Sequence, residues 1–367
     1  MRFDDDKRIV LTLDAGGTNF VFSAMQGNRE VVPPITLPSR GDDLETCMGQ
    51  MVSGFTSVQK RAPAKPVAIS FAFPGPADYP NGIIGDLNNL PAFHGGVALG
   101  PMLAAKFCLP VFINNDGDLF AYGEAMAGLL PEVNEMFAKA NSPRRYKNLF
   151  GVTLGTGFGG GIVRDGQLFI GDNSTGGEIW MLRNKLFPQA NIEESVSIRA
   201  VRRVYGEIAG MPCKDTPEPK DIFAIARGEK PGDKKAAMEA FRRMGEAAGD
   251  ALANVMTLID GLVVIGGGLA GAAPLFLPAL VAEMNNPLTT LDGRSLPRMA
   301  AKAFNLEDPA SLATFIAGKI TEIAVPGTDK TVRYDSLQRL GVGISKLGAS
   351  KAIAIGAYAF ALAALDR

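Results

Sequence analysis

The stretch LTLDAGGTNF, residues 11–20, decides the fold. An apolar run ends at Asp14, and two glycines and Thr18 follow at once. This pattern is typical of a buried strand that enters a tight turn. Glycines let backbone amides approach phosphate oxygens, and a threonine hydroxyl adds a donor. Because a carboxylate there would repel a phosphate unless a cation lay between them, Asp14 indicates a Mg²⁺ site; the alternative is an aspartate that only closes the turn.

Two further glycine-rich turns follow apolar runs, at 154–161 and 266–268. Either turn alone is also typical of a hairpin or a bulge. The letters G-x-G-x-x-G occur at Gly155, Gly157 and Gly160, but the segment that follows reads as a strand, which argues against a Rossmann dinucleotide site. Two halves that each open with strand, glycine turn and strand indicate a duplicated α/β architecture with a cleft between the halves.

A second carboxylate lies in VFINNDGDLFAYGE, residues 111–124. Asp116 follows a strand and precedes a helix, so we expect its side chain to project from the end of that strand. Phosphoryl transfer to a hydroxyl needs positioning, charge neutralisation and a base that accepts the hydroxyl proton, and Asp116 is the candidate base. The alternative is that Asp116 or Asp118 caps the helix, and for Asp118 capping is the preferred interpretation.

Composition bounds the classes of protein that the chain can be. Its 367 residues predict two domains, and a net charge of -1 gives no support for binding nucleic acid or an anionic membrane surface. Three cysteines lie far apart, at positions 47, 108 and 213, so neither a disulfide framework nor a four-ligand zinc cluster is expected. With no secretory signal and no apolar run of about 20 residues, the chain reads as cytoplasmic.

Local patterns predict several elements. We expect a hairpin over 19–32 with its bend at Gly27-Asn28, and helices over 42–61, 118–130 and 233–260. The region 285–346 carries too little pattern to assign.

Seven motifs occur in the order seen in the ROK family, which the chain resembles over nearly its whole length. They are LTLDAGGTN, FAFPGPAD, NNLPAF, NNDGDLFAYGEA, VTLGTGFGGGIV, STGGE and VVIGGGLA. The resemblance implies an α/β fold of two ribonuclease-H-like domains within the actin-like/hexokinase ATPase superfamily, with ATP and a hexose bound in the interdomain cleft. On this basis we expect a small domain of residues 1–130 plus 350–367 and a larger domain of residues 131–349.

The resemblance also assigns residues. Asp116 matches the family's catalytic base, and Asp14 would hold Mg²⁺ through water. The positions that match ATP-binding residues are Asp14, Gly16, Gly17, Thr18, Asn19, Gly155, Thr156, Gly157, Gly267 and Gly268. The positions that match sugar-binding residues are Gly75, Asn89, Asn115, Asp116 and Glu178.

The chain departs from the family after Glu178. Where the family has Gly-His, with a histidine that binds sugar and a structural zinc, this chain has Trp180-Met181. The family's cysteine-rich zinc motif should follow, but LRNKLFPQANIEES, residues 182–195, contains no cysteine, so no zinc is expected. Trp180, the only tryptophan, either packs on a sugar face or fills the space left by the zinc loop.

The resemblance implies an ATP-dependent hexose kinase, glucokinase-like, that uses Mg²⁺ and acts at the 6-hydroxyl. The alternatives are an N-acetylhexosamine or N-acetylmannosamine kinase and a non-catalytic sugar-binding sensor. A family repressor would carry a helix-turn-helix domain before the first phosphate loop, and only the acidic MRFDDDKRIVLT precedes it here. The expected partner is a hexose or amino sugar, and family analogy implies a homodimer.

Overall fold

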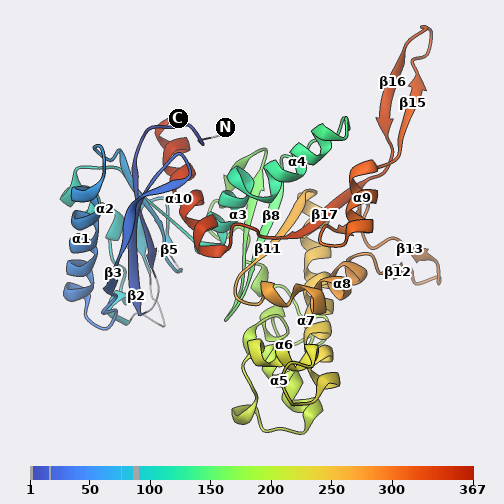
Figure 1. The fold of residues 1–367 in the computed structure, drawn as a ribbon, viewed down its shortest axis with the longest axis horizontal. Helices are drawn as coiled ribbons and strands as arrows, with labels where there is room; N and C mark the ends of the chain where they lie inside the picture. Colours follow the sequence, from blue (N-terminus) through green and yellow to red (C-terminus); the bar gives the residue numbers. More distant parts are fainter. Residues whose placement is uncertain (1–2, 16–17, 76, 86–90) are drawn as a thin grey trace. The chain divides into compact units, whose positions relative to one another are not determined.

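The computed structural model describes residues 3–15, 18–75, 77–85 and 91–367, and it separates into two compact units. The first unit comprises Met1–Gly128, Gly161–Gly177 and Leu347–Arg367, and the second comprises Leu129–Gly160 and Glu178–Lys346. Each unit is described by itself (Figure 1). None of the helices within the described ranges is both long and apolar enough to cross a bilayer.

The first unit is built on a five-stranded sheet of order β3-β2-β1-β4-β7. Its strands are β1 (Val10–Ala15), β2 (Asn19–Gln26), β3 (Arg29–Pro38), β4 (Ala68–Ala72) and β7 (Val111–Asn114). β1, β2 and β3 form an antiparallel meander, whereas β4 and β7 run parallel to β1. Gly27 and Asn28, with φ of 57° and 61°, form the bend between β2 and β3, which confirms the predicted hairpin.

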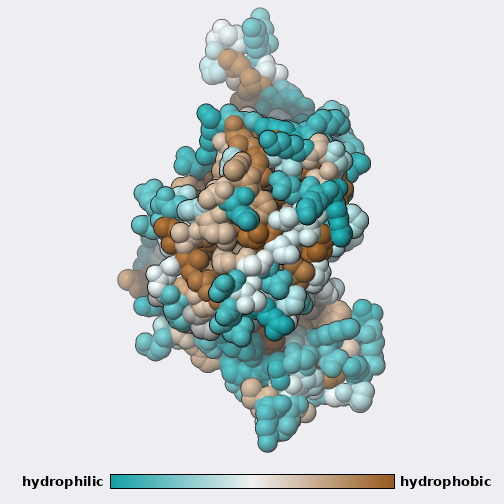
Figure 2. Space-filling model, turned by 90° about the vertical axis from the view of Figure 1, so that its left-hand side faces the viewer, coloured by the Kyte–Doolittle hydropathy of each residue, from teal (hydrophilic) through white to brown (hydrophobic). Residues whose placement is uncertain are grey.

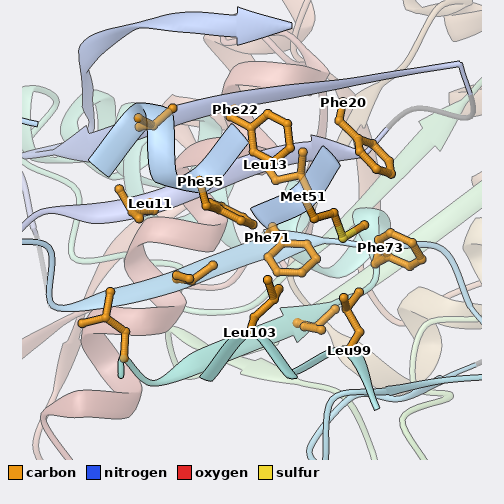
Figure 3. Close-up of a cluster of buried hydrophobic side chains, with 14 of the residues drawn as sticks. Leu11, Leu13, Phe20, Phe22, Met51, Phe55, Phe71, Phe73, Leu99 and Leu103 are labelled. Atoms are coloured by element: carbon orange, nitrogen blue, oxygen red, sulfur yellow. The ribbon is translucent and has the colours of Figure 1, made fainter. Parts of the chain in front are cut away.

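Helices cover both faces of this sheet. They are α1 (Leu44–Arg61), α2 (Leu99–Phe107), α3 (Asp116–Ala127) and α10 (Ala349–Leu365). Figure 3 shows the main core, where Phe55 of α1 packs edge-on against Phe22 of β2 and lies beside Phe71 of β4. The next residue, Ala72, packs with α3 and α10 instead, because successive side chains of a strand point to opposite faces.

Two short strands and one turn of 3₁₀-helix also belong to the first unit: β5 (Ala77–Asp78), β6 (Ile83–Ile84) and η1 (Pro91–Phe93). Helices α3 and α10 approach closely through glycines. A Cβ at Gly123 would lie 1.9 Å from the Ala352 carbonyl oxygen, and one at Gly356 would lie 1.9 Å from the Leu119 carbonyl oxygen. The two helices therefore pack backbone against backbone.

A second sheet has the order β10-β9-β8-β11-β17-β14. Its strands are β8 (Leu149–Leu154), β9 (Phe158–Arg164), β10 (Gln167–Phe169), β11 (Leu262–Gly266), β14 (Lys302–Asn305) and β17 (Arg339–Ile344). β9 and β10 are antiparallel, and β11 and β17 extend the sheet in parallel from β8. Apart from the added β14, the order repeats that of the first sheet, so the predicted duplication of an α/β unit is confirmed.

The helices of the second unit are α4 (Leu129–Lys139), α5 (Ile198–Ala209), α6 (Pro219–Arg227), α7 (Lys234–Ile259), α8 (Ala273–Met284) and α9 (Pro309–Ala317). Its 3₁₀ turns are η2 (Ile179–Met181), η3 (Ile192–Glu194), η4 (Cys213–Asp215) and η5 (Ala270–Ala272). The predicted helix over 233–260 corresponds to α7.

The region 285–346, which the sequence left unassigned, contains two hairpins besides β14, α9 and β17. They are β12 (Leu288–Thr289) with β13 (Ser295–Leu296), and β15 (Ile320–Ala324) with β16 (Thr331–Asp335). The second hairpin, which we call the arm, forms the protrusion at the top of Figures 1 and 2, and hydrophobic and hydrophilic residues share its surface. Ile323, Val332 and Tyr334 are exposed on it.

A buried ion pair anchors the base of the arm. Arg339 Nη1 donates to Asp335 Oδ2 at 2.7 Å, and Arg339 Nε donates to the Phe315 carbonyl oxygen at 2.5 Å. The guanidinium also lies over the rings of Phe137 and Phe315, so one arginine joins the end of β16 to α4 and α9.

Candidate active site

The predicted carboxylates lie at one edge of the first sheet. Asp14 pairs with Ala72 of β4, and Ala72 pairs with Asn114 of β7, so the three residues form a row across parallel strands. Adjacent strands are about 4.8 Å apart, which puts Asp14 roughly 10 Å from the strand end that leads into Asp116. The Asp14 side chain is exposed at this edge.

The start of α3 places Asn115 and Asp116. Asn115 is the N-cap, and its Oδ1 accepts a hydrogen bond of 2.8 Å from the Gly117 amide. Asp116 Oδ1 accepts from the same amide at 2.8 Å. The capping role assigned to Asp118 is wrong, because Asn115 caps the helix and Asp118 is buried in its first turn.

The environment of Asp116 perturbs its acidity. The residue reaches solvent, yet the protein around it desolvates the carboxylate, and this desolvation is the main cause that raises the pKa of Asp116. The hydrogen bond from the Gly117 amide opposes the shift, and the negative charge of Asp14 adds to it. A base whose pKa is raised toward neutrality is the better proton acceptor for a hydroxyl.

Other predicted positions of the first unit are only partly described. Gly16, Gly17 and Asn89 lie outside the described residues. Thr18 and Asn19 are exposed at the start of β2, where the Thr18 carbonyl oxygen accepts a hydrogen bond from the Ser39 amide.

Gly75 follows β4. A Cβ there would lie 3.1 Å from the Tyr79 hydroxyl, which itself donates to the Phe73 carbonyl oxygen at 2.9 Å. A side chain at Gly75 would therefore require the Tyr79 hydroxyl to move by a few tenths of an ångström.

In the second unit, the turn Gly155–Gly157 is held by hydrogen bonds from outside the turn. The Ile198 amide donates to the Gly155 carbonyl oxygen at 2.8 Å, and the Phe158 amide donates to Glu193 Oε2 at 3.0 Å. A Cβ on Gly157 would lie 2.6 Å from that Glu193 oxygen, so a side chain there would displace the Glu193 carboxylate from the Phe158 amide. A Cβ on Gly155 would meet no protein atom within 4 Å, so packing does not explain that glycine.

The third glycine turn, residues 266–268, contains one glycine that the fold requires and one that packing does not explain. Gly267 has a φ of 88°, and its Cβ would lie 2.4 Å from the Leu154 carbonyl oxygen, so the fold itself requires glycine there. A Cβ on Gly268 would meet nothing within 4 Å. Gly155 and Gly268 are therefore the two glycines that leave room for a ligand to approach the backbone.

Glu178 lies just before η2, half-buried, and its Oε2 accepts a hydrogen bond from the Trp180 indole Nε1. The sequence left the role of Trp180 open. It did not reveal Asn184, whose side chain hydrogen-bonds within residues 184–195, or Glu193, which accepts from the Phe158 amide. The sequence feature that could have revealed Asn184 is its position in residues 182–195, where the family has its cysteine-rich zinc motif and this chain has none of those cysteines.

The described residues offer few ligands for a metal ion. Within the described ranges, no group of three or more His, Cys, Asp or Glu side chains is arranged to hold an ion. Asp14 offers a single exposed carboxylate at a strand end. This fits Mg²⁺, which takes one or two carboxylates and completes its shell with water and substrate phosphates.

Comparison with known proteins agrees with the topology. The chain is 28% identical over 290 residues to an N-acetyl-D-glucosamine kinase of Photobacterium profundum, covering 74% of this chain and 88% of that protein. It is 27% identical over 292 residues to a glucokinase of Thermotoga maritima, covering 74% and 85%. The crystal structure of a glucokinase from Parabacteroides distasonis superposes with a TM-score of 0.91 at 56% identity, covering 99% of both chains.

The Parabacteroides glucokinase shares the α/β architecture described above, which is the actin-like ATPase fold. The ROK family model matches residues 10–305, a span that runs from β1 to the end of β14 and includes all three glycine turns, Asp116 and Glu178. This protein belongs to the ROK family.

Proposed function

We propose that the protein is an ATP-dependent hexose kinase that phosphorylates a glucose-like sugar at its 6-hydroxyl, with Asp116 as the general base. The observation that carries this proposal is the place of Asp116, which starts a helix at the same sheet edge as Asp14 and has a raised pKa. A carboxylate so placed can accept a proton from a substrate hydroxyl.

The reaction would run as an in-line displacement. Asp116 takes the proton of the sugar hydroxyl while the hydroxyl oxygen bonds to the γ-phosphorus, and the bond from that phosphorus to the oxygen bridging to ADP breaks. Asp14 would hold Mg²⁺, which supplies charge neutralisation to the phosphates when bound. The Gly155 amide already donates to the Gly157 carbonyl oxygen, so the donors proposed for phosphate oxygens are the amides of Thr156, Gly157 and Gly268, together with the Thr18 hydroxyl.

Two polar side chains are proposed to bind the sugar. Asn115 uses its Oδ1 to cap α3, so its amide Nδ2 is the donor for a sugar hydroxyl. Glu178 is the proposed acceptor, since carboxylate oxygens accept strongly from hydroxyls.

An N-acetylhexosamine kinase is the second candidate, since proteins named glucokinase and N-acetyl-D-glucosamine kinase both resemble the chain at similar identity. A third, non-catalytic sensor would bind sugar and release no ADP. The domain boundaries at 130 and 349, the homodimer and the cytoplasmic location stay predictions.

A substrate panel tests the proposal. Purified protein with Mg·ATP should release ADP with at least one of glucose, mannose, N-acetylglucosamine and N-acetylmannosamine. Asp116→Asn should lower kcat by about 10²-fold or more, while the matched control Asp42→Asn, an exposed aspartate before α1, should keep full activity. Sugar binding by calorimetry without ADP release from any sugar would favour the sensor, and an active Asp116→Asn variant would remove the proposed base.

A further inference from the structure

Residues 178–196, which we call the clamp segment, form a closed loop around one asparagine. Asn184 is completely buried, and both ends of its side-chain amide are used. Its Nδ2 donates to the Asn191 carbonyl oxygen at 3.1 Å and to Ser195 Oγ at 2.8 Å. Its Oδ1 accepts from the amides of Leu186 and Phe187 at 2.9 and 3.2 Å. All four of these bonds stay inside the clamp segment.

The backbone closes the same loop. The Asn184 amide donates to the Ala190 carbonyl oxygen at 3.0 Å, and the Ile192 amide donates to the Leu182 carbonyl oxygen at 2.7 Å. Arg183 and Asn191 form an antiparallel bridge between these two bonds. Backbone hydrogen bonds thus join residues 182–184 to residues 190–192, and the Asn184 side chain is buried inside the loop that they close.

The two ends of the clamp segment carry the two carboxylates of interest. At one end η2 follows Glu178, whose Oε2 accepts from the Trp180 indole. At the other end η3 carries Glu193, whose carboxylate accepts from the Phe158 amide beside the glycine turn and from Arg199. Since η2 and η3 lie against each other, one hydrogen-bonded piece joins Glu178 to the turn Gly155–Gly157.

We propose that Asn184 and Trp180 are positioning residues of this kinase, an inference that rests on the proposed function. Trp180 fixes Glu178 Oε2 and so leaves Oε1 directed to a sugar hydroxyl. Asn184 holds the clamp segment closed, and thereby sets the place of Glu178 relative to the turn that is proposed to bind phosphates. The clamp segment therefore positions both the proposed sugar-binding carboxylate and the proposed phosphate-binding turn of the second unit.

This arrangement predicts coupled binding. When one loop serves two ligands, ordering it for the first lowers the cost of binding the second, and the effect is reciprocal. Loosening the loop at Asn184 should weaken both ligands and reduce their coupling. Removing the Trp180 N–H should weaken the sugar alone, because Glu193 and Phe158 are untouched.

The experiment uses Trp180→Phe, Asn184→Ala and a matched control, Asn285→Ala. Asn285 is another asparagine of the second unit, and its side chain makes three hydrogen bonds, to Val281 and Ala303, outside the clamp segment. Steady-state kinetics give KM for sugar and for ATP, and thermal melts give Tm. Because Trp180 is the only tryptophan, its fluorescence reports on the clamp segment in every variant that keeps it.

We expect Trp180→Phe to raise KM for sugar about tenfold with KM for ATP unchanged, since a hydrogen bond to a charged group is lost. Asn184→Ala should raise both KM values and shift the Trp180 emission to the red. Asn285→Ala should lower Tm with both KM values and the emission unchanged. If Asn184→Ala does not fold, Ser195→Ala removes one bond of the network and should show the same changes in smaller measure.

The proposal is overturned if Asn184→Ala, or Ser195→Ala in its place, lowers Tm but leaves KM values and emission as in the control. It is overturned for Trp180 if Trp180→Phe keeps the wild-type KM for sugar. A wild-type protein that phosphorylates no sugar would instead refute the proposed function. In that case the emission shift of the Asn184 variant against the control still decides whether the asparagine holds the clamp segment.

Discussion

The carboxylate of Asp14 repels that of Asp116 and helps to raise its pKa. Both belong to the carboxyl edge of one parallel set of strands, β1 and β7 with β4 between them. The same relationship serves the proposed reaction, because Mg²⁺ at Asp14 would offset the repulsion just when Asp116 has to be ionised.

The pH dependence of turnover should show this raised pKa. Asp116 acts only when ionised, so kcat/KM should fall on the acid side with an apparent pKa above the ordinary aspartate value of 3.8. A pH–rate profile with a pH-insensitive coupling assay measures it. An acid limb at or below 3.8 would contradict the proposed environment of Asp116.

The raised pKa of Asp116 also predicts that replacing this carboxylate stabilises the folded protein at neutral pH. A carboxyl whose pKa is raised by folding disfavours the folded state once the pH exceeds the unfolded pKa, because ionising it costs more there. Asp116→Asn should therefore raise Tm at pH 7, and this gain should vanish near pH 3, where the wild-type carboxyl is protonated in both states. Melting curves of both proteins at the two pH values check the sign. A lower Tm for the variant at pH 7 would count against desolvation.

The glycines should separate into two groups under substitution by alanine. Gly267→Ala should destabilise the protein by about 1–3 kcal/mol, because its φ is 88° and its Cβ would meet the Leu154 carbonyl oxygen. Gly155→Ala and Gly268→Ala should leave the urea midpoint unchanged and raise KM for ATP, because no protein atom lies near either Cβ. Unchanged nucleotide kinetics in both variants would show that ATP does not approach these turns.

The buried ion pair at the base of the arm should dominate local stability. Asp335→Ala leaves the Arg339 guanidinium buried without its carboxylate and should cost about 3–5 kcal/mol of unfolding free energy. The double variant Asp335→Asn with Arg339→Met should cost less, since it leaves no fully buried charge without a partner. The remaining cation, Arg144, lies 3.5 Å from Asp335 in the wild type and is partly exposed. Urea denaturation of the three proteins at pH 7 makes the comparison.

This contribution should also depend on pH. Burial alone would raise the pKa of Asp335, but the Lys319 amide and Arg339 hold it below its ordinary value. Stability from this carboxylate is therefore present above the unfolded pKa and is lost as the pH falls through the lower folded pKa. The difference between wild type and Asp335→Ala should shrink in acid, and a constant difference from pH 7 to pH 2 would contradict the ion pair.

The sequence predicted those features that depend on neighbours along the chain. They are the strand that carries Asp14, the Gly27-Asn28 bend and the helix predicted over 118–130, which spans Asp116–Ala127 in the structure. Each follows from the local hydrophobic period or from turn chemistry. The recurrence of the strand–glycine–strand pattern also predicted a duplicated α/β unit, and the two sheets do share one strand order apart from the added β14.

Features that depend on distant partners could not be predicted. Glu193 holds the Phe158 amide across 35 positions, and nothing in the letters marks that pairing. The two strands of the arm were not predicted from the sequence, for a different reason. Most of their side chains are exposed on both faces, so no buried face imposes an apolar alternation on Ile320–Ala324 or Thr331–Asp335.

The close packing of α3 on α10 has a consequence for synthesis on the ribosome. The carbonyls that Gly123 and Gly356 let approach belong to helices more than 220 positions apart, and Arg8 pairs with Asp366 in the same unit. At about 5–20 residues per second, the five strands of the first sheet wait many seconds for α10. Meanwhile the long stretch from Glu178 to Lys346 has already emerged. Until α10 is made, α3 alone covers the face around Ala72, and the side that packs against Ala357 stays exposed.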